Sequence, residues 1–366
     1  MAIKKNQYFP QIAFHPGETL SDKLEEMGMS IKEFALRSGK PEKTIHAVIN
    51  GNSSVTADMS VAFETVLKIP ANFWMNLQRS YDEFVAREER KKILEDSYEW
   101  ARKFPYAEMV KKGWLSSKTQ IAEKTEELLK FFSFSNFKAW EDYYFNQELK
   151  LSFRISLSHS KEPFAVSAWL RRGELQSAEI EAAVYSEKKL KEVLPQLKKL
   201  MADHPENFFK SLQEKCLQAG VKVVYTPFIN KAPVNGCTRW INDSPLIQLS
   251  GRYQNNGSFW FTFFHEVGHI LLHGKKEIFL ENLTYSDINL EKEAEADDFA
   301  VQWTLTKAEE NEIIQKEAMT VSDIVDFAKK FKTHPGIIIG RLHHKKLLHF
   351  SVGREFLELI ELGEKK

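Results

Sequence analysis

Two histidines and a glutamate in one apolar segment are the residues of this chain best suited to chemistry. His265, Glu266 and His269 form a His-Glu-x-x-His pattern within the apolar run 259–273. On a helix, residues four apart lie about 40° apart around the axis and about 6 Å along it, so both imidazoles can reach one ion. Zn²⁺ lowers the pKa of bound water to about 7, and a neighbouring carboxylate can take its proton as the water attacks a carbonyl. The pattern therefore predicts a Zn²⁺ site, with His265 and His269 as ligands and Glu266 as general base.

A core helix that happens to carry two histidines is the alternative interpretation. Neutral imidazoles in a buried helix need polar partners, because an unpaired polar group costs free energy in an apolar environment. The apolar setting of this pattern therefore favours the metal.

A third protein ligand is expected, since hydrolytic zinc usually has three protein ligands and one water. His273 lies eight residues after His265, about 12 Å along an unbroken helix, so a helix-end hydrogen bond is its expected role. The metzincin pattern is excluded, because it has a third histidine where this chain has Lys275. The acidic segment 291–300 remains. A helix formed by it could supply a carboxylate ligand, and its other acids could hold the ring N–H of a ligating histidine.

The N-terminal segment 16–83 predicts a compact set of short helices. Ser30 and Glu33 have the spacing of a capping box at the start of the second helix. A turn at 38–41 precedes a third helix over 42–50. Further helices are expected from Thr56 and Pro70. Two helices joined by such a turn have the helix-turn-helix layout, although any small helical bundle could show the same spacing.

The rest of the chain divides into a helical and a mixed part. Residues 84–210 have helical periodicity and no pattern that predicts chemistry. Residues 221–225 and 246–250 predict strands, and Asn235-Gly236 and Asn256-Gly257 predict turns. Strands leading into the zinc-binding helix indicate a small α+β catalytic domain. The second strand could pair with an extended substrate, as edge strands do.

Composition limits the class of protein. A chain of 366 residues with 43% hydrophobic and 28% charged residues is globular and has two or three domains. Its formal net charge is zero, so nucleic-acid binding would need a local patch. Two distant cysteines, Cys216 and Cys237, fit reduced thiols better than a disulfide scaffold. With no apolar run of about 18 residues and no signal peptide after Lys4-Lys5, we expect a cytoplasmic protein without membrane contact.

The metal motif resembles a known family. His-Glu-x-Gly-His-x-x-x-His followed by Glu-Ala-Asp-x-Phe-Ala is similar to the ImmA/IrrE family of bacterial cytoplasmic zinc peptidases, and residues 262–273 and 293–300 carry the match. The resemblance implies a zincin-like, gluzincin-type fold. Where family members often have Leu-Leu-x-Pro, this chain has Trp303-Thr304-Leu305-Thr306. The site residues that the resemblance implies are the zinc ligands His265 and His269, the general base Glu266, and Glu295, the Glu before Ala-Asp, as third ligand.

The N-terminus resembles a second family. Residues 16–20, 28–35, 49–52 and 73–78 are similar to HigA-type antitoxins of the Cro/C1 helix-turn-helix class. The third helix would then enter the major groove of DNA. The candidate DNA contacts are Lys40, Lys43, Thr44, His46 and Asn50.

The charge of this N-terminal part limits the DNA interpretation. Residues 1–85 hold nine Lys and Arg against ten Asp and Glu. Affinity driven by phosphate contacts should therefore be modest, which favours a dimer or a role in binding protein.

These observations predict a mainly α chain with a small α+β domain. We expect a Cro/C1-type five-helix domain (1–85), a helical connecting domain (86–212) and a zinc metallopeptidase domain with C-terminal helices (213–366). The predicted function is a DNA-binding, antitoxin-like regulator of its own promoter. Its endopeptidase domain would cleave a protein partner such as a repressor. The alternative is a non-catalytic regulator or antitoxin of a toxin–antitoxin module, with the toxin as partner, whose zinc domain is a sensor or protein-binding module.

Overall fold

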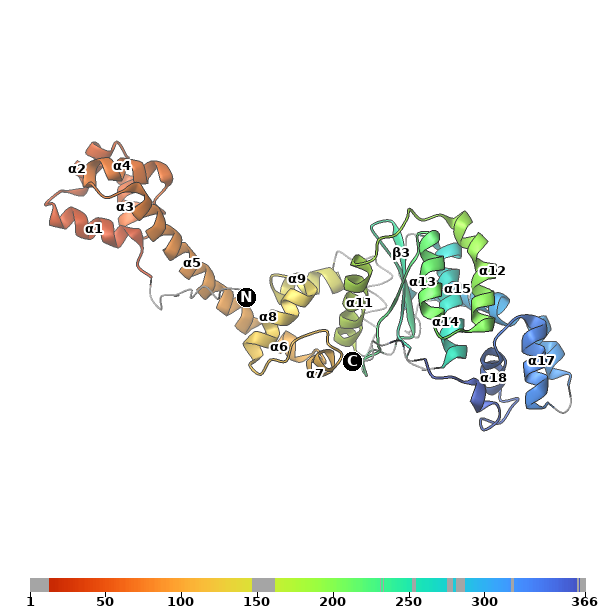
Figure 1. Cartoon of the computed structure of the whole chain (residues 1–366). Coiled ribbons are helices and arrows are strands. Elements are labelled where there is room, and N and C mark those ends of the chain that lie inside the picture. The colour runs from red at the N-terminus through yellow and green to blue at the C-terminus, as the bar shows by residue number, and fades with distance from the viewer. Residues whose placement is uncertain are drawn as a thin grey trace. The chain divides into compact units, whose positions relative to one another are not determined.

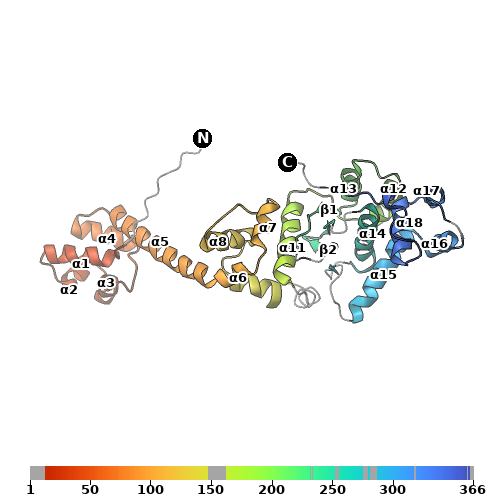
Figure 2. The ribbon, with the colours of Figure 1, turned by 90° about the horizontal axis from the view of Figure 1, so that it is seen from below.

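The computed structural model describes most of the chain, and helices predominate in it (Figures 1 and 2). Two compact units are formed, residues 1–96 and 97–366. The second contains a four-stranded sheet. This confirms the predicted mainly α fold with a small α+β domain, whereas the bounds of the three predicted domains stay predictions. The described residues are 13–146, 162–230, 232, 234–251, 255–274, 279–280, 287–316, 319–360 and 362.

Five helices make up the described part of the first unit. They are α1 (Pro16–Glu26), α2 (Ile31–Ser38), α3 (Glu42–Ile49), α4 (Ala57–Leu67) and α5 (Ala71–Asp96). The side chain of Ser30 accepts a hydrogen bond from the Glu33 N–H and caps α2, which is half of the expected capping box; the Glu33 carboxylate pairs with Arg37. The rings of Phe34, Phe63 and Trp74 join α2, α4 and α5, with centroids 5.0 and 5.6 Å apart. The predicted layout of two helices joined by a short turn is therefore present in α2 and α3.

Helices also fill the first half of the second unit. They are α6 (Tyr98–Arg102), α7 (Tyr106–Lys111), α8 (Ile121–Phe132), α9 (Phe137–Glu141), the π-helix η1 (Asp142–Asn146), α11 (Pro163–Ala178), α12 (Glu187–Asp203) and α13 (Phe208–Gln218). Trp140 is fully buried and stacks on Phe164, with ring centroids 5.2 Å apart. Trp100 and Phe104 pack edge-on against the same indole. This aromatic cluster forms a core for the short helices.

The sheet has the strand order β1-β3-β2-β4. Its strands are β1 (Lys222–Tyr225), β2 (Gly236–Ile241), β3 (Ser244–Leu249) and β4 (Phe279–Leu280). Strand β3 pairs in parallel with β1 and antiparallel with β2. Because both of its sides are occupied, the predicted pairing of this strand with a substrate is wrong.

Two turn predictions also need correction. Strand β2 begins at Gly236, and Asn256-Gly257 forms the first turn of a helix that Asn255 caps. The β2–β3 connection is instead Asn242-Asp243, where both residues have positive φ, 48° and 64°. A two-residue turn with positive φ at both positions matches the twist of a hairpin, and Asn and Asp tolerate it.

The C-terminal part of the chain contains a further set of helices. They are α14 (Asn256–Leu272), α15 (Asp287–Thr304), α16 (Lys307–Ile314), α17 (Val321–Phe331), α18 (Pro335–His344) and the short 3₁₀ helix η3 (Arg354–Phe356). Helix α14 contacts β2, β3, α15 and α18. The sheet lies between α14 and α11 (Figure 1). Successive residues of β3 contact these two helices in turn. Ile247 and Leu249 belong to the core that includes α14, whereas Gln248 donates a hydrogen bond to the Trp169 carbonyl of α11.

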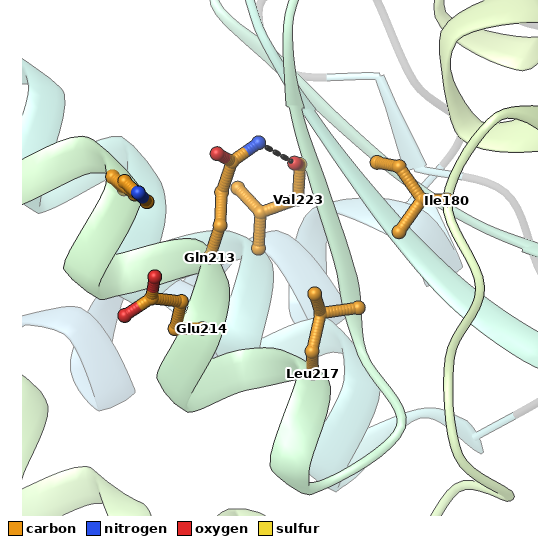
Figure 3. A pocket seen from close by; sticks show the side chains of 6 residues that line it. Ile180, Gln213, Glu214, Leu217 and Val223 are labelled. Carbon is orange, nitrogen blue, oxygen red and sulfur yellow. Dashed lines mark hydrogen bonds between the residues drawn. The ribbon is translucent and has the colours of Figure 1, made fainter.

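Side chains of neighbouring helices occupy the outer edge of β1. Gln213 of α13 donates to the Val223 carbonyl at 2.8 Å, and Gln176 of α11 donates to the Tyr225 carbonyl at 2.9 Å. Figure 3 shows the first of these bonds beside a cavity of about 220 Å³. This edge is therefore protected against pairing with another strand. No helix among the described residues is long and apolar enough to cross a membrane.

One buried and one half-buried histidine accept hydrogen bonds next to α14. Nδ1 of His204 accepts from the indole N–H of Trp260 at 3.0 Å, and Nδ1 of His334 accepts from the Gly336 N–H at 3.0 Å. Their ring centroids lie 5.3 Å apart. Burial lowers the pKa of His334 to about 4, and burial also lowers the pKa of His204. Both rings are therefore neutral in the folded protein at neutral pH.

We expect the free energy of unfolding to fall as pH decreases from about 6.5 to about 4. In this window the unfolded chain binds a proton at residue 334, whereas the folded chain does not until pH reaches the lowered pKa of His334. The stabilisation is complete above pH 6.5, and its loss across the whole window should be about 3 kcal/mol. His334→Asn keeps a capping oxygen and does not titrate. Urea unfolding at pH 7.5 and 4.5 should therefore show a smaller pH dependence in the variant, and equal dependence in both proteins would contradict this account.

Candidate metal centre

Small residues allow α14 and α15 to approach closely. A Cβ at Gly268 of α14 would lie 3.2 Å from the Ala296 Cα and 3.2 Å from the Phe299 Cβ of α15. Ala296 and Ala300 are fully buried. This close approach brings the histidine face of α14 against the acidic face of α15.

The two motif histidines and one carboxylate of α15 converge. The side chains of His265 and His269 are 2% and 1% exposed, and their Nε2 atoms lie 2.9 Å apart. Glu293 places Oε2 3.2 Å from Nε2 of His265 and Oε1 3.6 Å from Nε2 of His269. One ligand atom from each residue lies within 4.8 Å of the others. Two imidazole nitrogens and a carboxylate oxygen fit Zn²⁺, which binds His₂Glu sets in hydrolytic enzymes.

The structure places Glu293, and not the predicted Glu295, beside the histidine pair. Glu295 lies instead 2.8 Å from Nε2 of His273, and its side chain is 55% exposed. Residues four apart share a helix face, as Glu293 and Asp297 do, whereas a residue midway between them lies about 200° around the helix. Glu291 and Glu295 have the same four-residue spacing, so spacing alone does not show which acidic face of this helix meets the histidines.

The other ring nitrogen of each motif histidine also has a partner. Nδ1 of His265 lies 2.9 Å from Oδ1 of Asp297, and Nδ1 of His269 lies 3.0 Å from Nδ1 of His273. Burial, followed by the neighbouring His265 and His273, holds the pKa of His269 well below its usual value. His269 is therefore neutral, which is the form that binds a metal.

Glu266 lies on the part of α14 that packs against β2. Its side chain is fully buried, and its backbone carbonyl accepts a hydrogen bond from Oγ1 of Thr238 at 3.0 Å. A Cβ at Gly236 would lie 2.5 Å from Oε1 of Glu266 and 2.7 Å from Cγ2 of Thr262. A glycine is required here, because any larger residue would displace the carboxylate of Glu266.

The predicted DNA-contact residues lie on and beside α3. Ile45 and Val48 are fully buried and hold the helix in the core of the first unit. Lys43, His46 and Asn50 are exposed, at positions that follow one another around a single helical face.

The other two predicted contacts are less accessible. Thr44 is half-buried. The Lys40 side chain is 18% exposed and forms an ion pair with Asp58 at the start of α4. Lys40 is therefore engaged within the protein, in contrast to Lys43.

Both ends of the chain match known protein families. Residues 216–343 match the IrrE N-terminal-like domain, a peptidase family. Residues 20–74 match the helix-turn-helix family. The first match includes the converging histidines and Glu293, and the second includes α2 and α3.

Individual relatives match the N-terminal region. The chain is 26% identical over 66 residues to YddM of Escherichia coli, described as an uncharacterized HTH-type transcriptional regulator, covering 18% of this chain and 70% of that protein. A putative antidote protein of a plasmid maintenance system from Nostoc punctiforme is 32% identical in sequence. The match covers 23% of this chain and 92% of that protein, with a TM-score of 0.23. A HigA-family addiction module antidote protein from Coxiella burnetii is 32% identical in sequence. The match covers 23% of this chain and 91% of that protein, with a TM-score of 0.22.

A further solved structure is the Pseudomonas aeruginosa antitoxin HigA with the higBA promoter. Its sequence is 29% identical, and the match covers 22% of this chain and 89% of that protein, with a TM-score of 0.22. The chain thus joins a helix-turn-helix domain, whose relatives among solved structures are HigA-type antitoxins, to a domain of the IrrE N-terminal-like peptidase family.

Proposed function

We propose that this protein is a DNA-binding regulator whose C-terminal domain is a zinc-dependent endopeptidase. The observation that carries the proposal is the convergence of His265, His269 and Glu293 within 4.8 Å, one residue away from the buried carboxylate of Glu266. The match of this region to a peptidase family supports the same assignment. A protein partner such as a repressor is the proposed substrate.

In this proposal the two histidines and Glu293 hold zinc, and Glu266 handles protons. When bound, zinc supplies Lewis acidity that polarises a carbonyl and makes water a stronger acid. Glu266 accepts the proton of the attacking water at its carboxylate and returns it to the leaving amine. The contact with Gly236 limits where this carboxylate can lie. Asp297 accepts a hydrogen bond from His265 and orients its ring.

For DNA, the exposed face of α3 is the proposed reading surface. Lys43 would contact a phosphate and Asn50 a base edge, with His46 between them on the same face. Lys40 would contribute less, because Asp58 already neutralises it. Since the N-terminal part is nearly neutral, two copies on one operator would compensate for weak phosphate contacts.

The near-complete burial of both imidazoles and of Glu266 favours one alternative function, in which the metal domain does not catalyse a reaction. A metal enclosed in this way could act as a sensor or stabilise a protein-binding domain of an antitoxin without turnover. The two functions differ in what they require of Glu266, because only catalysis needs a proton acceptor there.

We expect about one Zn²⁺ per chain, because the donor set offers one site. His265→Ala, His269→Ala and Glu293→Ala should each lose the metal, since each removes one of three converging ligand atoms. Glu295→Ala should still bind zinc, with an affinity at most about 100-fold below that of the wild type. Elemental analysis and competition with a chelator measure both outcomes. Zinc loss in Glu295→Ala but not in Glu293→Ala would restore Glu295 as the ligand.

We expect Glu266→Gln to retain zinc and stability but to lose cleavage of the partner by about 10²-fold or more, since an amide cannot accept the proton. The measurement compares wild type and variant at matched levels in cells, by immunoblot of candidate repressors and by promoter activity. Identical regulation under every stress tried would favour the sensor.

We expect Lys43→Ala to weaken binding to the chain's own promoter and to random DNA equally, and to reduce the salt slope by about one. Asn50→Ala should cost about 1–3 kcal/mol on the promoter alone. Arg79→Ala, a substitution at an exposed position of α5, is the control. It should change neither the affinity for DNA nor the salt slope. Dissociation constants at two salt concentrations test this, and no preference of the wild type for the promoter would exclude the regulator.

A further inference from the structure

A chain of hydrogen-bonding groups leads from the histidine pair to the protein surface. Nδ1 of His269 lies 3.0 Å from Nδ1 of His273, and Nε2 of His273 lies 2.8 Å from Oε2 of Glu295. The side chain of His273 is 3% exposed, whereas that of Glu295 is 55% exposed. The His273 ring is therefore enclosed between one motif histidine and one surface carboxylate.

The carboxylate sets the direction of these hydrogen bonds. An ionised carboxylate only accepts, so Nε2 of His273 must donate to Glu295. With a metal bound, Nε2 of His269 would use its lone pair, so the hydrogen of this ring would be on Nδ1, where Nδ1 of His273 can accept it. This arrangement leaves the Nε2 lone pair of His269 available to the metal. That lone pair is on the nitrogen that faces His265 and Glu293.

We propose that His273 and Glu295 are positioning residues that hold His269 in the tautomer with a bare Nε2, ready to bind the metal. Asp297 has the same effect on His265 through a direct contact with Nδ1. The role assigned here to Glu295 rests on the proposed metal site, and it differs from that of a ligand. Such outer partners of ligating histidines fix ring orientation, and their loss typically weakens metal binding by about 10–100-fold.

Reversing the charge at residue 295 should reverse the direction of the chain. In Glu295→Lys the ammonium donates to Nε2 of His273, so Nδ1 of His273 carries the hydrogen and donates to His269. His269 then keeps its hydrogen on Nε2, where it opposes metal binding. Glu295→Gln is the conservative variant, because its amide oxygen can still accept from His273. Glu291→Lys is the matched control, since it makes the same charge change at an exposed position of α15.

The experiment measures zinc affinity of the full chain by competition with a chelator. Glu295→Lys should bind zinc at least about tenfold more weakly than Glu291→Lys, whereas Glu295→Gln should bind within about threefold of wild type. Unfolding of the metal-free proteins should be alike, because residue 295 is exposed.

A second pair of variants tests His273 itself. His273→Asn keeps an acceptor oxygen near the position of Nδ1 and should restore most of the affinity that His273→Ala loses. Equal zinc affinity in Glu295→Lys and Glu291→Lys would overturn the positioning role while leaving the metal site intact. Complete loss of zinc in Glu295→Gln would also overturn it, in favour of a ligand. A wild type that binds no zinc would instead overturn the proposed metal site.

Discussion

The close packing of α14 against α15 is the contact on which the candidate site depends. Gly268 and Ala296 leave room for two backbones to approach, and the acids of α15 reach the histidines of α14 only because of that approach. A larger residue at 268 would have to displace Ala296 or Phe299 and would separate His269 from Glu293. The site therefore needs small residues that take no part in its chemistry.

This packing also explains how polar groups can lie in an apolar helix. Two imidazoles with almost no exposure would cost several kcal/mol without partners. α15 supplies Asp297 for one ring, and His273 supplies the partner for the other. Each ring then has one satisfied nitrogen and one that faces Glu293. The hydrogen bonds that make burial tolerable are the same ones that point the ligand atoms toward a common position.

The sequence predicted those parts of the structure that depend on neighbouring residues. Helical periodicity, caps such as Ser30 and the His-Glu-x-x-His spacing are local, so the helix-turn-helix layout and the two histidines could be identified directly. The choice between Glu293 and Glu295 depended on which face of α15 meets α14, which is a tertiary property. Strand β2 was missed because its turn residues, Asn242 and Asp243, contain no glycine or proline.

The requirement for Gly236 connects the sheet to the chemistry of α14. The histidines of that helix face α15, whereas Glu266 lies against β2, so two different layers of the domain define the site. Strand β2 can lie this close to Glu266 only where it has no side chain. The sheet therefore determines where the carboxylate can be, independently of the contacts that orient the imidazoles. In the proposed peptidase, a mutation in β2 would then abolish proton transfer while zinc binding survives, and a mutation in α15 would weaken zinc binding while Glu266 keeps its position.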